Sequence, residues 1–464
     1  MPMTLSGILQ SGMSSLKTFQ NGLAITSSNI ANASTPGYSR QRMNLSEEDP
    51  LSIIPGQVGM GVQITSISRQ RSPFIDNAVR AEIGQQAKYQ QVGQDLQNME
   101  GVLGNPTNPT LNADLTNFYN AFQTLSTSPQ DVISNRQNVI EAGTTLASDF
   151  QTANAQLATV QSGLDTQVNQ SATDINSMLT SVASLNQQIN NVSQHGSTPN
   201  DLMDQRDQLL DKLSGYMDLT LSTQTNGSIN IAVNGQSLVN NFTASSVSVA
   251  SVGSPAHPQI QAGGVSLATS GGQVAGFVQS YTNIDSMQNS LDSLASVVIN
   301  QVNAIHAAPG AAFDLNGAQG VNFFTGSSAS TMAMNPVVQN DPAKVVAGKT
   351  AAKGDNTAAL AMVALQDQLV YPAGVPTGTL GSAISTLSLQ LGSQANQANS
   401  MQTTHSNSLK NLTAEQASVS GVSTDEELTN MMQYQRAYQA ASRVITTVDE
   451  CMDMIINRMG KVGL

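Results

Sequence analysis

Four aspartates lie at steps of three, three and four residues, a spacing that places them on one face of a helix: Asp201, Asp204, Asp207 and Asp211. Clustered carboxylates can bind a metal ion or share acid–base chemistry. The same residues also fit a simpler role, because acidic groups in the first turn of a helix interact favourably with its dipole. Asn200 or Asp201 is placed to cap that helix. We therefore predict a helix start with a solvated acidic face, and not a catalytic or metal site.

The other residue types that carry chemistry are spread along the chain. The four histidines show no metal-ligand spacing to one another or to a carboxylate cluster: His195, His257, His306 and His405. We predict that each is solvated or caps a helix. Residues 314–317, Asp-Leu-Asn-Gly, begin like a calcium loop, but the later oxygen ligands and the glutamate are missing. Nucleotide-binding glycine loops, nucleophile elbows and zinc spacings are absent from the sequence, which therefore predicts no catalysis, no metal and no cofactor.

The composition narrows the class of partner. The chain has 464 residues, a net charge of -13 and only 11% charged residues. Such an acidic chain is poorly suited to bind nucleic acid or an anionic membrane surface. Cys451 is the only cysteine, which excludes an intramolecular disulfide. The sequence shows neither an apolar run of the ~18 residues that a membrane span needs nor a Sec-type signal peptide. These features alone indicate a cytoplasmic location, unless the chain is exported by a route other than Sec.

Both ends of the chain carry apolar stripes at helical spacing. The front stripe alternates steps of four and three residues: Leu5, Leu9, Gly12, Leu16, Phe19, Leu23, Thr26 and Ile30. The back stripe has nearly the same spacing: Met431, Gln435, Tyr438, Ser442, Ile445, Val448, Met452, Ile455 and Met459. This spacing is typical of the seam of a left-handed coiled coil, although the front stripe alone also fits an ordinary bundle helix. Lys17 is the only charged residue before Arg40, so we expect the two ends to pair and then to pack against other copies.

The stripes also predict how the free chain behaves. The apolar area that one such helix can bury is too small to offset the conformational entropy lost on ordering it. We therefore expect both ends to be disordered or loosely paired in the monomer and ordered in an assembly. Strong amide-exchange protection across residues 5–30 and 430–459 of the monomer would contradict this hypothesis.

Hydrophobic periodicity predicts the elements between the two ends. Helices are expected at 4–32, 74–104, 111–125, 157–192, 202–213 and 283–306, and again from 380 to 412. Strands are expected at 38–46 and 58–68, joined as a long hairpin, and in a β-rich region at 218–330 that the helix at 283–306 interrupts or borders.

The order helical, β-rich, helical predicts a mainly α protein with a β-rich inserted domain and discontinuous domains. The terminal helices, pairing as a coiled coil, and the hairpin form a core from residues 1–73 and 421–464. A helical bundle takes 74–217 and 331–420, and the β-rich outer domain takes 218–330.

Two segments carry a specific resemblance. The run Asn29-Ile-Ala-Asn32-Ala-Ser-Thr-Pro36-Gly37-Tyr38-Ser-Arg40-Gln41 closely resembles the signature of bacterial flagellar rod, hook and hook-associated proteins. The C-terminal residues 421–450, with Tyr-Gln-Arg-Ala-Tyr at 434–438, resemble the matching end of that family. The segment 200–209, followed by strands, narrows the resemblance to the hook-associated proteins of the hook–filament junction. The signature loop is then marked by Asn29, Asn32, Pro36, Gly37 and Tyr38.

The resemblance implies a non-catalytic structural protein that joins two tubes outside the cell, exported through the flagellar type III apparatus. Its terminal helices line the core of the assembly, which assigns axial packing to Leu5, Leu9, Leu16, Phe19, Leu23, Ile30, Met431, Tyr438, Ile445, Val448, Met452, Ile455 and Met459. The implied partners are further copies in a ring, the hook protein, hook-associated protein 3 and an export chaperone. The candidates for chaperone binding on the C-terminal helix are Met431, Tyr438, Ile445, Val448 and Met452.

Other interpretations stay open at this stage. Another axial flagellar protein, a secreted coiled-coil adhesin, or an enzyme with a hydrolase in the insert would share parts of this pattern. Deletion of residues 218–330 separates the last case, since an enzyme would lose activity while an adaptor could still assemble through its ends. Arg436 and Arg443 lie seven residues apart on one helix face, where they could pair with a neighbour's carboxylates or simply be solvated.

Overall fold

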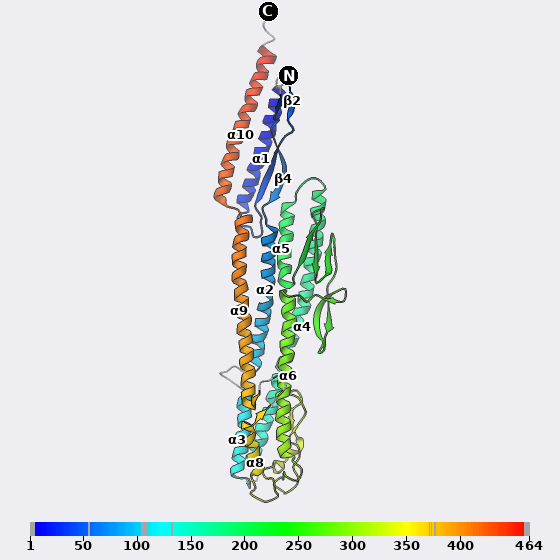
Figure 1. Cartoon of the computed structure of the whole chain (residues 1–464), viewed down its shortest axis with the longest axis vertical. Coiled ribbons are helices and arrows are strands. Elements are labelled where there is room, and N and C mark those ends of the chain that lie inside the picture. Colours follow the sequence, from blue (N-terminus) through cyan, green and yellow to red (C-terminus); the bar gives the residue numbers. More distant parts are fainter. Residues whose placement is uncertain are drawn as a thin grey trace, which may run out of the picture. The chain divides into compact units, whose positions relative to one another are not determined.

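The computed structural model describes residues 5–53, 56–103, 110–130, 133–370, 372, 374 and 377–458 (Figure 1). The described chain is mainly helical with several small antiparallel sheets, which confirms the predicted fold class at this level. It divides into two compact units. The first unit holds residues 1–84, 174–247 and 405–464, and the second holds 85–173 and 248–404. The division into three domains stays a prediction.

The helices follow the predicted order, with two differences in length. The larger ones are α1 (Leu5–Ala31), α2 (Pro73–Leu103), α3 (Thr110–Thr127), α4 (Ser134–Ser193), α5 (Asn200–Tyr216), α6 (Gly272–His306), α9 (Leu380–Ser420) and α10 (Thr424–Asp453). The shorter ones are α7 (Pro336–Gln339), η1 (Pro342–Lys344), α8 (Thr357–Ala364), η2 (Leu365–Asp367) and a π-turn, η3 (Met454–Arg458). The borders of the two units fall inside α2, α4 and α9.

Helices α4 and α6 begin earlier than the periodicity predicted. α4 starts at Ser134 and not near 157, because Leu146 and Phe150, both 0% exposed, extend its buried stripe. α6 starts at Gly272 and not near 283, because Val274 and Phe277 are buried on its first turns. The helix predicted at 283–306 is therefore present but longer, and the β-rich interpretation is wrong for residues 272–282.

The strands form small antiparallel sheets, in which successive strands are mostly connected by short turns. The first unit contains β1 (Gln41–Glu47), β2 (Leu51–Ile53), β3 (Gly56–Val58), β4 (Val62–Arg69), β5 (Thr220–Thr223), β6 (Ile229–Val233), β7 (Gln236–Asn240) and β8 (Thr243–Ala244). The second contains β9 (Ser248–Val252), β10 (His257–Ala262), β11 (Val265–Ser266), β12 (Phe324–Thr325), β13 (Ala333–Met334), β14 (Leu369–Val370) and β15 (Gly378–Thr379). β1 pairs with β4 along a register shifted between Asn44 and Leu45, which confirms the predicted long hairpin.

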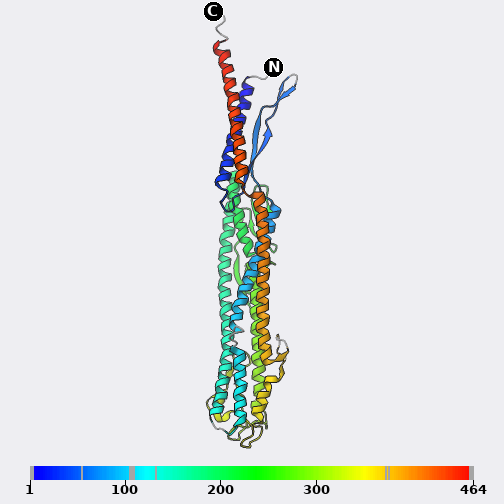
Figure 2. The same cartoon turned by 90° about the vertical axis from the view of Figure 1, so that its left-hand side faces the viewer.

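In the first unit, α10 packs along α1 and the β1–β4 hairpin lies beside α1 (Figure 2). The hydroxyl of Ser14 donates to the carbonyl of Val62 at 2.6 Å, which ties the hairpin to the helix. The four-stranded sheet β5-β6-β7-β8 is attached to α4 through Asn186, which is 0% exposed. Its amide donates to the carbonyl of Ile229 at 2.8 Å and accepts from the Ile229 N–H at 3.1 Å.

The second unit has an aromatic core where α3 meets the β12 segment. Phe118, Phe122, Phe323 and Phe324 are each 0% exposed, and Phe118 and Phe122 meet edge to face with centroids 5.2 Å apart. His306 of α6 lies against Phe323 at 5.1 Å. Edge-to-face aromatic pairs of this kind add to the free energy gained by burial.

The histidine prediction is wrong at two of the four positions. His306 is fully buried: Nδ1 lies 2.5 Å from the Val321 carbonyl oxygen, and Nε2 accepts from the Val346 N–H at 3.0 Å. Burial lowers the pKa of His306 to about 4, so the ring is neutral with its proton on Nδ1. His257 is also buried, 2.9 Å from Asp285. The sequence could not show these partners, because each comes from a segment at least fifteen residues away.

The predicted helix cap and solvated acidic face at α5 are also wrong. The residue at the N-cap position is Pro199, which makes no side-chain cap. Asp204 and Asp207 are 5% and 7% exposed, and both form ion pairs with Arg69. The spacing showed a shared helix face but not the arginines that cover it.

Candidate assembly site at the terminal helices

Two glycines of α1 allow close contact with α10. A Cβ atom at Gly12 would lie 3.0 Å from Cγ1 of Ile445. At Gly22 it would lie 3.0 Å from the ring of Tyr434 and 2.9 Å from Met43. The predicted front and back stripes therefore meet at Gly12 and Ile445, where a small residue accommodates a large one.

The large apolar side chains of both stripes are covered only in part. Those predicted on α1 are all half-buried: Leu5, Leu9, Leu16, Phe19, Leu23 and Ile30. On α10, Val448 is buried, whereas four others are half-buried: Met431, Tyr438, Ile445 and Met452. Ile455 is 49% exposed, and Met459 lies outside the described residues. The buried positions of α1 are small or polar instead, and include Thr18, Thr26 and Asn29.

The helix pair leaves an apolar groove and an apolar ridge on its surface. The groove has a volume of about 440 Å³ and is lined mainly by small residues: Ile8, Ser11, Gly12, Ser15, Phe19, Ala437, Ala440, Ala441 and Val444. The ridge is formed on α10 by Leu428 and Met432, which are 48% and 52% exposed. Met13 of α1 is 58% exposed. Large apolar side chains four residues apart on one helix face, such as Leu428 and Met432, form a candidate interaction surface when they are exposed.

The signature loop after α1 is fixed by Asn29, which is 1% exposed. Its amide group donates to the carbonyl of Gln41 at 2.9 Å and to Oε2 of Glu427 at 3.0 Å. Its Oδ1 accepts from the Tyr38 hydroxyl at 2.8 Å and from the Gln41 N–H at 3.0 Å. Burial raises the pKa of Tyr38, which keeps the phenol protonated as this donor. One amide thus connects α1, the loop, β1 and α10.

Arg40 connects the same loop to the first turn of α10. Its Nε donates to Oε1 of Glu427 at 2.8 Å and its Nη1 to Oε2 of Glu426 at 2.9 Å. Glu427 is only 1% exposed. Its buried negative charge is compensated by the guanidinium of Arg40 and by the side-chain amide of Asn29. Burial alone would lower the pKa of Arg40, but the two glutamates raise it and keep the guanidinium charged.

The middle of the loop has its own constraints. Gly37 adopts a φ of 78°, a left-handed conformation that favours glycine, and a Cβ there would lie 2.2 Å from the amide nitrogen of Gln208. That nitrogen donates to the carbonyl of Pro36 at 3.0 Å. Asn32 is more peripheral, with its amide donating to the carbonyl of Ser28 at 3.0 Å. The signature residues therefore fix a turn, and apart from Asn29 and Tyr38 they do so at the surface.

The sequence reasoning missed Glu427 and Arg40 as functional residues. Both stood inside the quoted motifs, but an acidic residue in a first helical turn is usually explained by the helix dipole alone. A buried carboxylate opposite the signature loop is recognised only once its partner, 387 residues away in sequence, is in place.

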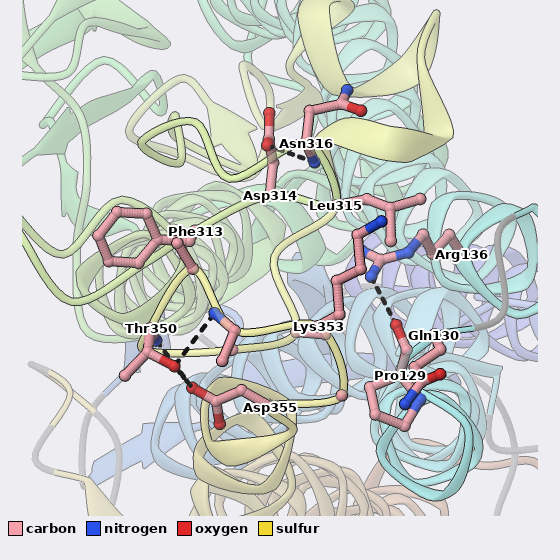
Figure 3. Close-up of a pocket in the computed structure, with 15 residues that line it drawn as sticks. Pro129, Gln130, Arg136, Phe313, Asp314, Leu315, Asn316, Thr350, Lys353 and Asp355 are labelled. Carbon is pink, nitrogen blue, oxygen red and sulfur yellow. Dashed lines mark hydrogen bonds between the residues drawn. The ribbon is translucent and has the colours of Figure 1, made fainter.

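A cavity beside residues 314–317, which begin like a calcium loop, has no calcium ligand set (Figure 3). It has a volume of about 430 Å³ and lies in the second unit between the segments at 313–316 and 347–355. The carboxylate of Asp314 accepts from the N–H groups of Asn316 and Ala318 and pairs with Lys344 at 2.8 Å. Within the described residues, no group of three or more His, Cys, Asp or Glu side chains is placed to hold a metal ion.

None of the helices within the described ranges is both long and apolar enough to cross a membrane.

Comparisons with known proteins match the same two ends and the region between them. The flagellar hook-associated protein FlgK helical domain matches residues 96–324. The flagellar basal body rod FlgEFG protein C-terminal family matches 416–459, and the flagella basal body rod protein family matches 9–38. Over 98% of both chains, the sequence is 31% identical to flagellar hook-associated protein 1 of Bacillus subtilis. The chain belongs to the flagellar hook-associated protein 1 family. It is a structural flagellar junction protein.

Other members of the hook-associated protein 1 family are more distant. The Salmonella typhimurium protein is 24% identical over 98% of this chain and 100% of its own length. The solved structure of the flagellar hook junction protein FlgK from Burkholderia pseudomallei is 26% identical, with a TM-score of 0.48, over 54% of this chain and 46% of that chain. The two rod-protein matches fall on α1 with its signature loop and on α10, the elements that form the candidate assembly site.

Proposed function

We propose that this chain is a self-assembling, non-catalytic adaptor between hook and filament, and that it assembles through the α1–α10 pair. The observation that supports the proposal most directly is the coverage of that pair. The two helices pack on each other, yet most of their predicted packing residues remain half-buried, and the ridge of Leu428 and Met432 is exposed. Neighbouring copies would complete the burial.

The groove and the ridge suggest how copies meet. If the groove of small residues on one copy receives the ridge of large residues on the next, the contact is heterologous. Such a contact closes into a ring or continues as a helix. The seam between α1 and α10, with its steps of four and three, has the spacing of a left-handed coiled coil. α1 carries Lys17 as its only charge, so little repulsion opposes close packing of several copies.

The partners follow from the family resemblance. The ring of copies would lie between the hook protein and hook-associated protein 3, outside the cell, after export without a Sec signal peptide. Before export a chaperone would cover the C-terminal helix at Met431, Tyr438, Ile445, Val448 and Met452. In the folded chain Val448 is 5% exposed. A chaperone that binds there would therefore have to replace α1.

The domain roles complete this proposal. Residues 1–73 with 421–464 would form the axial core, 74–217 with 331–420 the helical domain, and 218–330 the outer domain. Seven strands of the described outer segment lie between Thr220 and Ser266, so the β-rich part would be largely confined to its first half.

Cells that lack this chain test the junction role. Electron microscopy of their hook-basal bodies should show hooks of normal length without filaments. Filaments attached to such hooks would contradict the proposal.

A double variant tests the assembly surface. Leu428→Glu with Met432→Glu places two charges on the exposed ridge, where they cost little in the free chain but oppose burial against a neighbour. We expect an unchanged circular dichroism spectrum, and filaments lost in cells. Gln439→Glu, at another exposed position of α10, is the matched control and should retain filaments. Normal filaments in the double variant would exclude the ridge as the contact surface.

A further inference from the structure

We propose that the acidic face of α5 is a latch that holds the signature loop, and through it the end of α1, in one position. The proposal rests on the assembly function, because it assigns a purpose to that fixed position. Asp204 of α5 accepts from the backbone N–H of Ser39 at 3.0 Å and from its hydroxyl at 2.6 Å. Ser39 is 1% exposed and Asp204 5% exposed, so both bonds are shielded from water.

The same carboxylate also holds the far end of the hairpin. Nη1 of Arg69, the last residue of β4, donates to Asp204 at 2.6 Å and to Asp207 at 2.7 Å. The N–H of Gln70 donates to the carbonyl of Arg40 at 2.8 Å and closes the base of the hairpin. Asp204 therefore gathers the segment that enters the hairpin and the segment that leaves it at one point of α5.

Further ion pairs fix the latch to α2 and α9. Arg71 pairs with Asp76 through two bonds of 2.9 Å and lies 3.3 Å from Asp207. Arg80 of α2 donates to Asp211 at 2.7 Å, and Asp76 also accepts from Gln416 of α9. Bidentate arginine–carboxylate pairs restrict orientation as well as distance.

The protonation states agree with a charged network. Burial alone would raise the pKa of Asp76, but hydrogen bonds from Arg71 and Gln416 lower it. Burial alone would lower the pKa of Arg71, but its bond to Asp76 and the charge of Asp207 raise it. These groups therefore stay ionised when buried, and removal of one partner leaves the other uncompensated.

α5 contacts the loop on both sides of Ser39 as well. Gln208 donates to the carbonyl of Pro36 at 3.0 Å, and Gln41 donates to Asp201 at 3.2 Å. Residues 38–40 belong to no helix or strand, so bonds to other segments must hold them. The arrangement distinguishes the latch from the α1–α10 seam, since none of its bonds depends on apolar contact between those helices.

Amide exchange on the full-length monomer tests the latch. We expect Asp204→Asn to speed exchange across residues 36–41 by about tenfold or more, because the Ser39 N–H loses its charged acceptor. Gln205→Glu, which changes the charge by one unit at an exposed position of α5, is the control and should leave this exchange within about twofold. Ser39→Ala keeps the N–H bond and removes only the hydroxyl bond, so its effect should lie between these two. It also keeps the test valid if Asp204→Asn does not fold.

Two outcomes would overturn the proposal. Exchange across 36–41 in Ser39→Ala and in Asp204→Asn equal to that of Gln205→Glu would show that α5 does not hold the loop. Faster exchange with normal filaments in cells would show that the fixed position has no role in assembly. Both outcomes can be distinguished from failure of the proposed function. If the ridge is not the assembly surface, the Leu428→Glu, Met432→Glu variant will keep its filaments while amide exchange in the loop stays slow.

Discussion

The aromatic core of the second unit and the α1–α10 pair of the first bury their apolar residues to different degrees. Phe118, Phe122, Phe323 and Phe324 are each 0% exposed. The six large apolar residues of the front stripe are all half-buried, and Met432 of α10 is 52% exposed. The first region is complete within one chain, whereas the second leaves apolar surface exposed on the single chain.

The difference follows from what surrounds each region. The aromatic core collects side chains from α3, α6 and the β12 segment, so every ring has neighbours on several sides. Two helices and a two-stranded hairpin cannot surround each other, because each covers only one side of its partner. Under the proposed function, a region of this second kind would gain most of its burial on assembly. Substitutions in both regions test whether their packing differs in this way.

The largest effect is expected in the aromatic core. Phe118→Ala should lower the free energy of unfolding by about 3–5 kcal/mol, because a fully buried ring leaves a cavity among its neighbours. Urea denaturation followed by circular dichroism measures this. Phe74→Ala, at a side chain that is 83% exposed, should change stability by less than about 0.5 kcal/mol. Equal losses of unfolding free energy in Phe118→Ala and Phe74→Ala would contradict the idea that the aromatic core is complete within one chain.

The pH dependence of the same core is the next largest effect. The pKa of His306 is about 4 in the folded chain because of burial, against 6.5 for the ordinary side chain. The unfolded chain therefore binds more protons between these values, and stability falls as pH drops from 6.5 to 4, by up to about 3 kcal/mol. His306→Gln cannot be protonated, so its stability should vary less over this window. If the stability of the variant falls with pH in parallel with that of the unchanged protein, His306 is not the group responsible.

A smaller effect is expected at the helix pair. Alanine usually stabilises a helix relative to glycine by about 0.5–1 kcal/mol, as expected for Gly163→Ala, where nothing lies within 4 Å of the added carbon. Gly22→Ala should instead destabilise the pair by about 1–2 kcal/mol, since the added carbon meets Tyr434 and Met43. Amide exchange along α1 reports the change. A gain at Gly22 similar to that at Gly163 would show that the seam is loose in the free chain.

The smallest effect on the free chain is expected at the exposed arginines of α10. Arg436→Ala and Arg443→Ala should each change the thermal stability of the monomer by less than about 0.5 kcal/mol, because both side chains are exposed. If they pair with carboxylates of a neighbour, the same variants will weaken assembly at low salt more than at high salt. Assembly that is insensitive to both variants would leave the arginines as solvated residues.

Much of the fold could be predicted because it depends on local pattern. The stripe from Leu5 to Ile30 with Pro36-Gly37 behind it gave α1 to within two residues, and the alternation around Val62 and Ile64 gave the hairpin. The start of α6 was missed, because the residues of its first turns are packed by other elements and include glycines that read as a loop. Where tertiary packing stabilises a helix, local propensity is a weak guide.

The candidate site was predicted only in its apolar part. Apolar spacing identifies the faces of α1 and α10, because a helix repeats every 3.6 residues whatever its neighbours. Asn29 and Tyr38 were identified through the family signature. Glu427 and Asp204 were not, because a carboxylate on a helix looks solvated until its partner is placed opposite to it.

The order of the elements, the low charge of the first helix and the family resemblance could all be read from the sequence. These properties are carried by residues close together in the chain and need no knowledge of contacts. Only the tertiary structure decided that His306 is neutral, that α5 presents buried aspartates to Arg69 and Ser39, and that Arg40 reaches Glu427. The physical reason is that protonation and ion pairing depend on burial and on partners up to 387 residues away, which no local spacing encodes.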